Sequence, residues 1–189
     1  EFAEHVDKGC PLVMGGPLPH VLAAKAVALT EANTQEFKAY ARRIVENART
    51  LAEACLAQGM RVLSGGTDNH LLLIDVRPFG LTGRQAESAV RECGITLNRN
   101  SLPYDSNGAW YTSGLRIGTP AVTTLGMGAA EMKEIAACLY QVLSNTKPER
   151  ITQGDKAGQK SKARYCLEER VKSEVRARIQ ALLDRFPVY

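Results

Sequence analysis

Segments with helical and with strand-like spacing of apolar residues alternate in this chain, and their order constrains the fold more than any single motif. An apolar residue at every third or fourth position is typical of an amphipathic helix, and short β-branched runs bounded by Gly, Pro or Asn are typical of strands. From residue 33 the order is helix, strand, strand, helix, strand, strand, helix, connector, helix. We therefore predict an α+β fold: a small, largely antiparallel sheet with helices packed on one face, preceded by linking helices.

Residues at the ends of these segments support the assignment. Asn33 with Glu36 and Thr82 with Gln85 have the spacing of capping boxes, which begin helices. The predicted helices cover residues 18–29, 33–59, 82–94 and 129–145 and a last segment after Leu167, and the predicted strands are "RVLSGG" (61–66), "HLLLIDVRP" (70–78), "ITLNRN" (95–100) and "GLRIGTP" (114–120).

The segment 145–164 differs in composition from the rest of the chain. It contains four Lys and two Gly, and Ile151 is its only large apolar residue. Because such a segment buries little apolar surface, we predict an exposed, basic connector. The helix in residues 165–189 is then expected to complete the domain formed by residues 33–144.

Composition limits the class of protein. The chain has 189 residues, of which 44% are hydrophobic, enough for one full core. No apolar run approaches the ~20 residues that span a bilayer, so we predict no membrane segment. The first residues lack the basic and apolar regions of a signal peptide, and since the first residue is not Met, we expect a piece of a longer polypeptide.

Charge and cysteine content narrow the partners and the compartment. The formal charge of +4 is concentrated late in the chain, which is too weak and local for a nucleic-acid interface, and we predict no nucleic-acid partner. The five cysteines include no C-x-x-C pair, and their odd number argues against a disulfide framework. Reduced thiols are typical of the cytoplasm, where we expect the protein to reside.

No complete catalytic set is visible. His5, His20 and His70 do not have metal-ligand spacing, and G-x-S-x-G, Walker and Rossmann sequences are absent. We therefore predict no metal site and no catalytic residue within this chain. In "GGTDNH" (65–70), Asx side chains are more typical of a turn than of catalysis.

One cation stands out in "YTSGLRIGTPAVTT" (111–124). Arg116 lies in a segment that otherwise has the small, apolar and β-branched residues of a buried strand. A buried guanidinium requires an anion, because an unpaired buried charge costs several kcal/mol. Either a carboxylate of the protein forms a structural ion pair with Arg116, or a ligand supplies the anion.

Six stretches together resemble a known family. They are "GGPLPHVLAAKAVAL", "SGGTDNHLLLIDV", "GLTGRQAE", "ITLNRNSLPYD", "TSGLRIGTPAVTT" and "RFPVY", in that order. The chain resembles serine hydroxymethyltransferases, pyridoxal-phosphate enzymes of fold type I, from Gly15 to its C-terminus. It departs from them in two ways: the Schiff-base lysine that follows a run of threonines and a His is absent, and the connector is longer and more basic.

The resemblance implies roles for several residues. Arg116 matches the arginine that binds the α-carboxylate of the amino-acid substrate, where a planar guanidinium can donate two parallel hydrogen bonds. Gly15 and Gly16 match the glycine pair that meets the phosphate of pyridoxal 5′-phosphate, donated across a dimer interface. Backbone N–H groups without a Cβ can approach phosphate oxygens closely.

A second set would serve the folate co-substrate. Asn100 matches the asparagine that binds the pteridine of tetrahydrofolate, for which an amide offers both donors and an acceptor. Gly108, Ala109 and Trp110 match the segment beside that co-substrate. The family usually has Ser or Pro and then Phe here, so Ala109 and Trp110 are departures. An Asn100 that only caps a turn is the alternative.

The resemblance implies an activity for the whole protein. It is the conversion of serine and tetrahydrofolate to glycine and 5,10-methylenetetrahydrofolate through a pyridoxal-phosphate aldimine, by a homodimer or tetramer. Residues 1–32 would end the large domain, residues 33–144 would form the small domain, and the chain alone would be inactive. Two alternatives remain: another fold-type I enzyme, such as an aldolase or aminotransferase, and a free-standing module whose basic connector binds RNA or an acidic partner.

Overall fold

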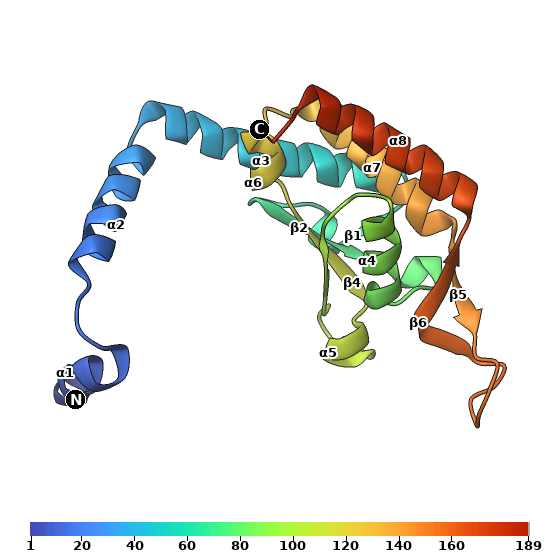
Figure 1. The fold of residues 1–189 in the computed structure, drawn as a ribbon, viewed down its shortest axis with the longest axis horizontal. Coiled ribbons are helices and arrows are strands. Elements are labelled where there is room, and N and C mark those ends of the chain that lie inside the picture. The colour runs from blue at the N-terminus through green and yellow to red at the C-terminus, as the bar shows by residue number, and fades with distance from the viewer. Residues whose placement is uncertain (189) are drawn as a thin grey trace. The chain divides into compact units, whose positions relative to one another are not determined.

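The computed structural model describes residues 1–188 and divides the chain into two compact units (Figure 1). The first is Glu1–Ala41 and the second begins at Arg42. The division falls inside helix α3 (Gln35–Ala57), later than the predicted boundary between residues 32 and 33. The last predicted segment, residues 165–189, ends on Tyr189, which lies outside the described residues.

The first unit is helical and has no core of its own. It contains α1 (Ala3–Gly9), a π-helical turn (Cys10–Met14), α2 (Pro19–Ala32) and the start of α3, and no residue of α1, the π-helical turn or α2 is buried. No single helix among residues 1–188 is long and apolar enough to cross a membrane. Taken together, the helical segments Ala3–Met14 and Pro19–Ala32 have sufficient length and apolar composition, but they are bent by 104° relative to each other.

The second unit is built on a four-stranded antiparallel sheet. Its order is β1-β2-β4-β3, and β2 and β3 run parallel with β4 between them, so that β2, α4 and β3 form a split β-α-β unit. The strands are β1 (Arg61–Val62), β2 (Leu71–Asp75), β3 (Asn98–Asn100) and β4 (Gly114–Gly118), and the main helices besides α3 are α4 (Gly83–Glu92), α7 (Ala129–Ser144) and α8 (Glu169–Arg185). The predicted fold class is confirmed.

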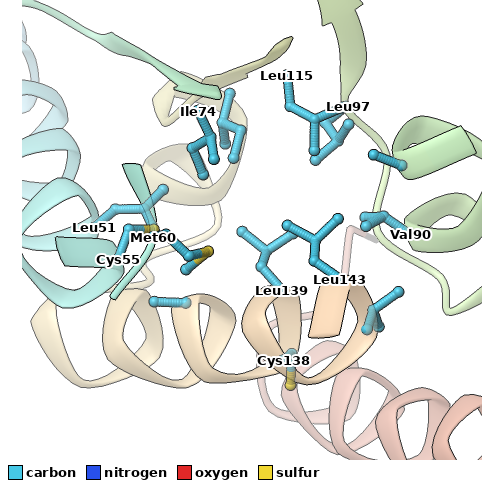
Figure 2. Close-up of a cluster of buried hydrophobic side chains, with 14 of the residues drawn as sticks. Leu51, Cys55, Met60, Ile74, Val90, Leu97, Leu115, Cys138, Leu139 and Leu143 are labelled. Atoms are coloured by element: carbon cyan, nitrogen blue, oxygen red, sulfur yellow. The ribbon is translucent and has the colours of Figure 1, made fainter. Parts of the chain in front are cut away.

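Helices cover one face of this sheet. Figure 2 shows Leu139 and Leu143 of α7 pointing towards Ile74 and Leu115 of the sheet, all of them buried. Leu51 and Cys55 of α3 and Val90 of α4 flank them, while Cys138 on the other side of α7 points towards α8. Because side chains alternate along a strand, burying Leu115 and Ile117 of β4 turns the residue between them to the opposite face.

Helix ends agree with the prediction in α4 and differ in α3. The capping box of Thr82 and Gln85 is present, with the Gln85 amide donating to the Thr82 hydroxyl at 3.2 Å. The predicted box of Asn33 and Glu36 is wrong: α3 begins at Gln35, and the Thr34 hydroxyl accepts from the Phe37 amide at 3.2 Å. Thr34 is therefore the N-cap residue.

The predicted connector at residues 145–164 is a β-hairpin. Strands β5 (Thr146–Arg150) and β6 (Lys160–Leu167) pair antiparallel, and β6 alternates between exposed and more buried positions. Its inward positions include Ser161 and Ala163, which carry too little apolar surface to show this pattern in the sequence. The segment is basic and largely exposed, as predicted, but it has regular structure.

Short elements complete the unit. The third predicted strand, residues 95–100, is a strand only over its last three residues, and the loop after it contains a helical turn. The remaining short elements are 3₁₀ turns at Leu63–Gly65 and Arg77–Phe79 and helices α5 (Gly108–Tyr111) and α6 (Pro120–Thr124).

A buried carboxylate joins the first two strands to the turn after them. Asp75 has a fully buried side chain that accepts hydrogen bonds from Nε and Nη2 of Arg77 at 2.9 and 2.8 Å, and Nη1 of Arg61 lies 3.4 Å away. Burial acts to raise the pKa of Asp75, but the hydrogen bonds and charges of the two arginines outweigh it and hold that pKa below its usual value.

We expect Asp75→Asn to lower the free energy of unfolding at pH 7 by about 1–2 kcal/mol, because it removes charge-assisted hydrogen bonds. Since the folded-state pKa is depressed, this contribution is present above the unfolded-state pKa of ~3.9 and is lost as the pH falls through the folded-state value. Urea denaturation at pH 7 and in acid measures it, with the exposed hairpin residue Asp155→Asn as control. Equal loss in both variants would contradict the assignment.

Candidate functional site

The face of the sheet away from the helices carries the candidate site. Arg116 on β4 is paired in register with Leu73 of β2 and Asn98 of β3, so its side chain emerges at the centre of this open face. It is exposed, whereas its neighbours Leu115 and Ile117 are buried. The segment that has the composition of a buried strand is therefore buried on one face only, and the alternation along β4 directs Arg116 to solvent.

One protein group holds the guanidinium. Nε of Arg116 donates to Oδ1 of Asn98 at 3.2 Å. Among residues 1–188, no Asp or Glu forms an ion pair with Arg116, and its two Nη atoms donate to no residue of this part of the chain. The structural ion pair is thus not formed here, and the two Nη groups can donate hydrogen bonds to a planar anion such as a carboxylate.

A hollow of about 740 Å³ lies beside this arginine. Its lining includes Leu73, the cross-strand neighbour of Arg116, the Gly65–Gly66 turn and Pro103 from the loop after β3. Small-molecule sites typically combine a concave surface with a few polar groups, here the backbone of the Gly65–Gly66 turn and the unengaged Nη atoms of Arg116. Within residues 1–188, no cluster of His, Cys, Asp or Glu is arranged to hold a metal ion.

The turn at this hollow is held by its own side chains. Oδ1 of Asn69 accepts from the Leu71 amide at 2.9 Å, and the Thr67 hydroxyl donates to the Leu71 carbonyl at 2.6 Å. Asp68 is exposed and lies 3.8 Å from Arg49. The prediction that "GGTDNH" has a structural role is confirmed for Asn69, which forms an Asx turn.

Asn100 lies on the same open face, one strand from the arginine. It is paired with Gly114, two positions before Arg116 on β4, and is half-buried. Its Nδ2 donates to the Ser101 carbonyl at 2.7 Å, a local bond. The structure thus brings Asn100, Asn98 and Arg116 together on one surface; Asn98 was not among the sequence candidates, although it lies at the alternate position before Asn100.

Trp110 lies on the other side of β3. Its ring is 5.1 Å from the guanidinium carbon of Arg84 on α4 and 5.6 Å from that of Arg99. Arg99 alternates with Asn98 and Asn100, and its Nη1 is 2.8 Å from Glu87 of α4. The Trp110 ring therefore does not share the face of Arg116, although Gly108, Ala109 and Trp110 belong to the loop that joins β3 to β4.

A carboxylate that sequence reasoning missed holds this loop together. Asp105 accepts hydrogen bonds from the amides of Leu102 and Asn107 at 3.1 and 2.9 Å and from the Ser113 hydroxyl at 2.7 Å. Partial burial acts to raise the pKa of Asp105, but these hydrogen bonds outweigh it and keep that pKa below its usual value. The sequence does contain a signal for this role, because Asp105 follows Pro103 and Tyr104 in a polar loop and Asp side chains commonly accept hydrogen bonds from nearby backbone amides in turns.

The loop ends in a strained residue packed against α4. Thr112 has φ +54°, a conformation that β-branched residues rarely adopt. The Gly83 amide donates to the Thr112 carbonyl at 3.0 Å, and a Cβ at Gly83 would lie 2.1 Å from Oγ1 of Thr112 and 2.7 Å from the Gly114 carbonyl oxygen. Gly83 is therefore required for this close approach.

Gly15 and Gly16 lie in the first unit, between the π-helical turn and α2. Gly15 has φ +75°, and a Cβ at either position would meet no atom within 4 Å. The Gly16 amide donates no hydrogen bond within residues 1–188. The pair is thus an exposed backbone turn with an available donor, as a phosphate site needs.

Buried thiols supply no nucleophile. Burial raises the pKa of Cys55 to about 12 and the pKa values of Cys93 and Cys138 to about 11, so these thiols remain protonated. They pack in the core, as predicted.

Comparison with known proteins identifies the family. The family model described as "Serine hydroxymethyltransferase" matches residues 1–139, which include the arginine-bearing strand, the turn at the hollow and the glycine pair. The chain belongs to the serine hydroxymethyltransferase family. The resemblance inferred from the six sequence motifs is thereby confirmed.

Relatives within this family match the whole chain. It is 61% identical to a serine hydroxymethyltransferase of Treponema pallidum, 52% to one of Chlamydia muridarum and 54% to one of Salinispora tropica, each over 189 residues. These residues make up 32%, 37% and 39% of the three relatives, so the chain spans roughly a third to two fifths of their length. The β5–β6 hairpin lies outside the 1–139 match to the family model but inside all three of these alignments.

We expect Asp105→Ala to loosen the loop between β3 and β4, because three hydrogen-bond donors lose their acceptor, and to cost about 1–3 kcal/mol of stability. Amide exchange at residues 102–113 should accelerate more than exchange in α7. Acidification through the depressed pKa of Asp105 should act in the same direction. Unchanged exchange in this loop would show that the carboxylate does not hold it.

Gly83→Ala is expected to destabilise the chain by about 1–3 kcal/mol, because overlap with Thr112 and Gly114 outweighs the better helix propensity of Ala. Thermal unfolding measures the effect. Adding Thr112→Gly should restore part of the loss, since it removes Oγ1 and suits the positive φ. Gly9→Ala, where a Cβ meets nothing within 4 Å, is the control.

Proposed function

We propose that this chain is part of an enzyme that transfers a hydroxymethyl group from serine to tetrahydrofolate, giving glycine and 5,10-methylenetetrahydrofolate. The observation that carries the proposal is the guanidinium of Arg116, exposed at the centre of the open sheet face with its Nη edge unengaged by residues 1–188. Membership of the serine hydroxymethyltransferase family supports the same reaction class.

Arg116 has the properties of a carboxylate-binding group. Its Nε bond to Asn98 limits rotation of the guanidinium plane, which leaves the two Nη donors in a fixed orientation. A substrate carboxylate held by two parallel hydrogen bonds would have its Cα bonds oriented. Asn98 is then a positioning residue for Arg116.

The chain also offers a partial fit to pyridoxal 5′-phosphate. The available Gly16 amide and the open space at Gly15 and Gly16 suit a phosphate group. Bound to the complete protein, the cofactor would supply an electron sink for bonds at the substrate Cα. Lys8 and Lys25, the lysines nearest to the glycine pair in the sequence, lie in helices α1 and α2 outside any threonine-rich context. This chain would therefore supply contacts to the cofactor phosphate and the substrate carboxylate but no Schiff-base lysine.

Asn100 would bind the pterin of tetrahydrofolate from the same open face. Its Nδ2 is used locally by Ser101, so its Oδ1 is the atom that remains to accept from the pterin. We further propose that the complete protein is a homodimer or tetramer, because apolar side chains such as Leu12, Val13 and Met14 are exposed in the first unit and favour association. We place it in the cytoplasm because all five cysteines are free thiols.

Arg116→Ala in the full-length protein should abolish serine binding while pyridoxal phosphate stays bound, because only the carboxylate loses its partner. Arg116→Lys should restore little of the serine affinity, since an ammonium group cannot form two parallel hydrogen bonds to the carboxylate. Spectroscopic titration with serine measures both, with the exposed Arg170→Ala as control. Retained serine affinity in Arg116→Ala would overturn the assignment.

Folate dependence separates this function from that of a related fold-type I enzyme. In the full-length protein, tetrahydrofolate should accelerate exchange of the glycine α-proton, and Asn100→Ala should reduce that acceleration. An aldolase or aminotransferase would keep its need for Arg116 and show no response to tetrahydrofolate.

A further inference from the structure

The β5–β6 hairpin is attached to the first turn of α4 by buried and partly buried hydrogen bonds. The Thr82 hydroxyl donates to the Lys162 carbonyl at 2.8 Å. Nε2 of Gln85 donates to the carbonyls of Ser161 and Arg164, both at 2.8 Å. The two residues of the capping box therefore bind the hairpin as well as beginning the helix, so the hairpin and α4 are held as one body.

The same turn of α4 holds the end of the β3–β4 loop. Gly83, between the two capping residues, contacts Thr112 through a backbone hydrogen bond and through the close approach that only a glycine permits. Within residues 1–188, Oγ1 of Thr112 is buried without a hydrogen-bond partner. A strained residue with an unsatisfied hydroxyl persists only where its surroundings hold it in place.

The hairpin also reaches this loop directly. Nζ of Lys162 lies 5.8 Å from the centre of the Tyr111 ring, within the range of a cation–π contact. Figure 1 shows α4 beside strand β6, with α5 below α4. The loop is thus supported on the side away from the open face by α4, and at Tyr111 by the hairpin.

We propose that the β5–β6 hairpin, through Lys162 on Tyr111, is a positioning element that holds the β3–β4 loop in the conformation described above and so strengthens binding of the folate co-substrate. The inference rests on the proposed function. It assigns a role to a segment outside the family-model match of residues 1–139.

The position of the loop explains why folate affinity is the affected quantity. The loop begins after Asn100, the proposed pterin contact, and ends at Gly114, two residues before Arg116. Asn98 holds Arg116 from the strand itself, independently of the loop. Pro103 of this loop lines the hollow, so loosening the loop adds an ordering cost to folate binding and leaves the carboxylate contact intact. Lys162 touches no reacting group and acts only through Tyr111.

The test uses the full-length enzyme with Lys162→Ala, Lys162→Arg and the hairpin-tip control Lys156→Ala. Lys162 and Lys156 are both exposed, so each alanine variant removes one surface charge without removing a buried group. Lys162→Ala should raise KM for tetrahydrofolate by about two- to fivefold, the loss of one cation–π contact, with kcat and KM for serine unchanged. Lys162→Arg should restore the KM, and Lys156→Ala should not change it.

A KM for tetrahydrofolate that is unchanged in Lys162→Ala, or raised equally in Lys156→Ala, would overturn the inference. Amide exchange at residues 108–113 gives a second readout that does not depend on activity: it should be faster in Lys162→Ala than in the parent and the control. If the parent enzyme shows no folate-dependent activity, the proposed function is refuted. If amide exchange at residues 108–113 is unchanged in Lys162→Ala, the proposal that the hairpin holds the β3–β4 loop is refuted, whatever the outcome for the proposed function.

Discussion

The backbone contact between Gly83 and Thr112 is the constraint on which much of the second unit depends. It joins the first turn of α4 to the residue at which the β3–β4 loop becomes strand β4. Strand β4 lies between β2 and β3, so its start sets the pairing on both sides. Because a one-residue shift in register would exchange the two faces of β4, this contact helps to keep Leu115 in the core and Arg116 outside.

The two faces of the sheet therefore differ in function: one forms the core and the other carries the candidate site. Helices α3, α4 and α7 bury one face, and the other carries Arg116, Asn98 and Asn100 beside a hollow lined by the Gly65–Gly66 turn. An exposed arginine without an ion pair in residues 1–188 contributes little to stability and is suited to binding an anionic ligand. In a chain that spans roughly a third to two fifths of its relatives, such an open face is consistent with a site completed by the rest of the protein.

Elements with strong local signals could be predicted, and elements defined by their neighbours could not. The apolar stripe of α7 and the capping box of Thr82 and Gln85 are local patterns, and both were predicted correctly. The hairpin was missed because Ser161 and Ala163 are too small to mark a buried side, and its order comes from hydrogen bonds to α4. For the candidate site, motif resemblance selected Arg116 and Asn100, while Asn98 and Asp105 became apparent only from their partners.

The amino-acid order alone was enough to indicate the helices, an antiparallel sheet and the family and to single out Arg116, since these depend on periodicity and short motifs. Tertiary structure decided which way that arginine points and what lies near it. The small and apolar neighbours of Arg116 are typical of a buried strand, yet alternation along a strand covered on one side directs Arg116 to solvent. The separation of Trp110 from Asn100 likewise follows from the pairing of β3 with β4, which places neighbouring residues of β3 on opposite faces of the sheet.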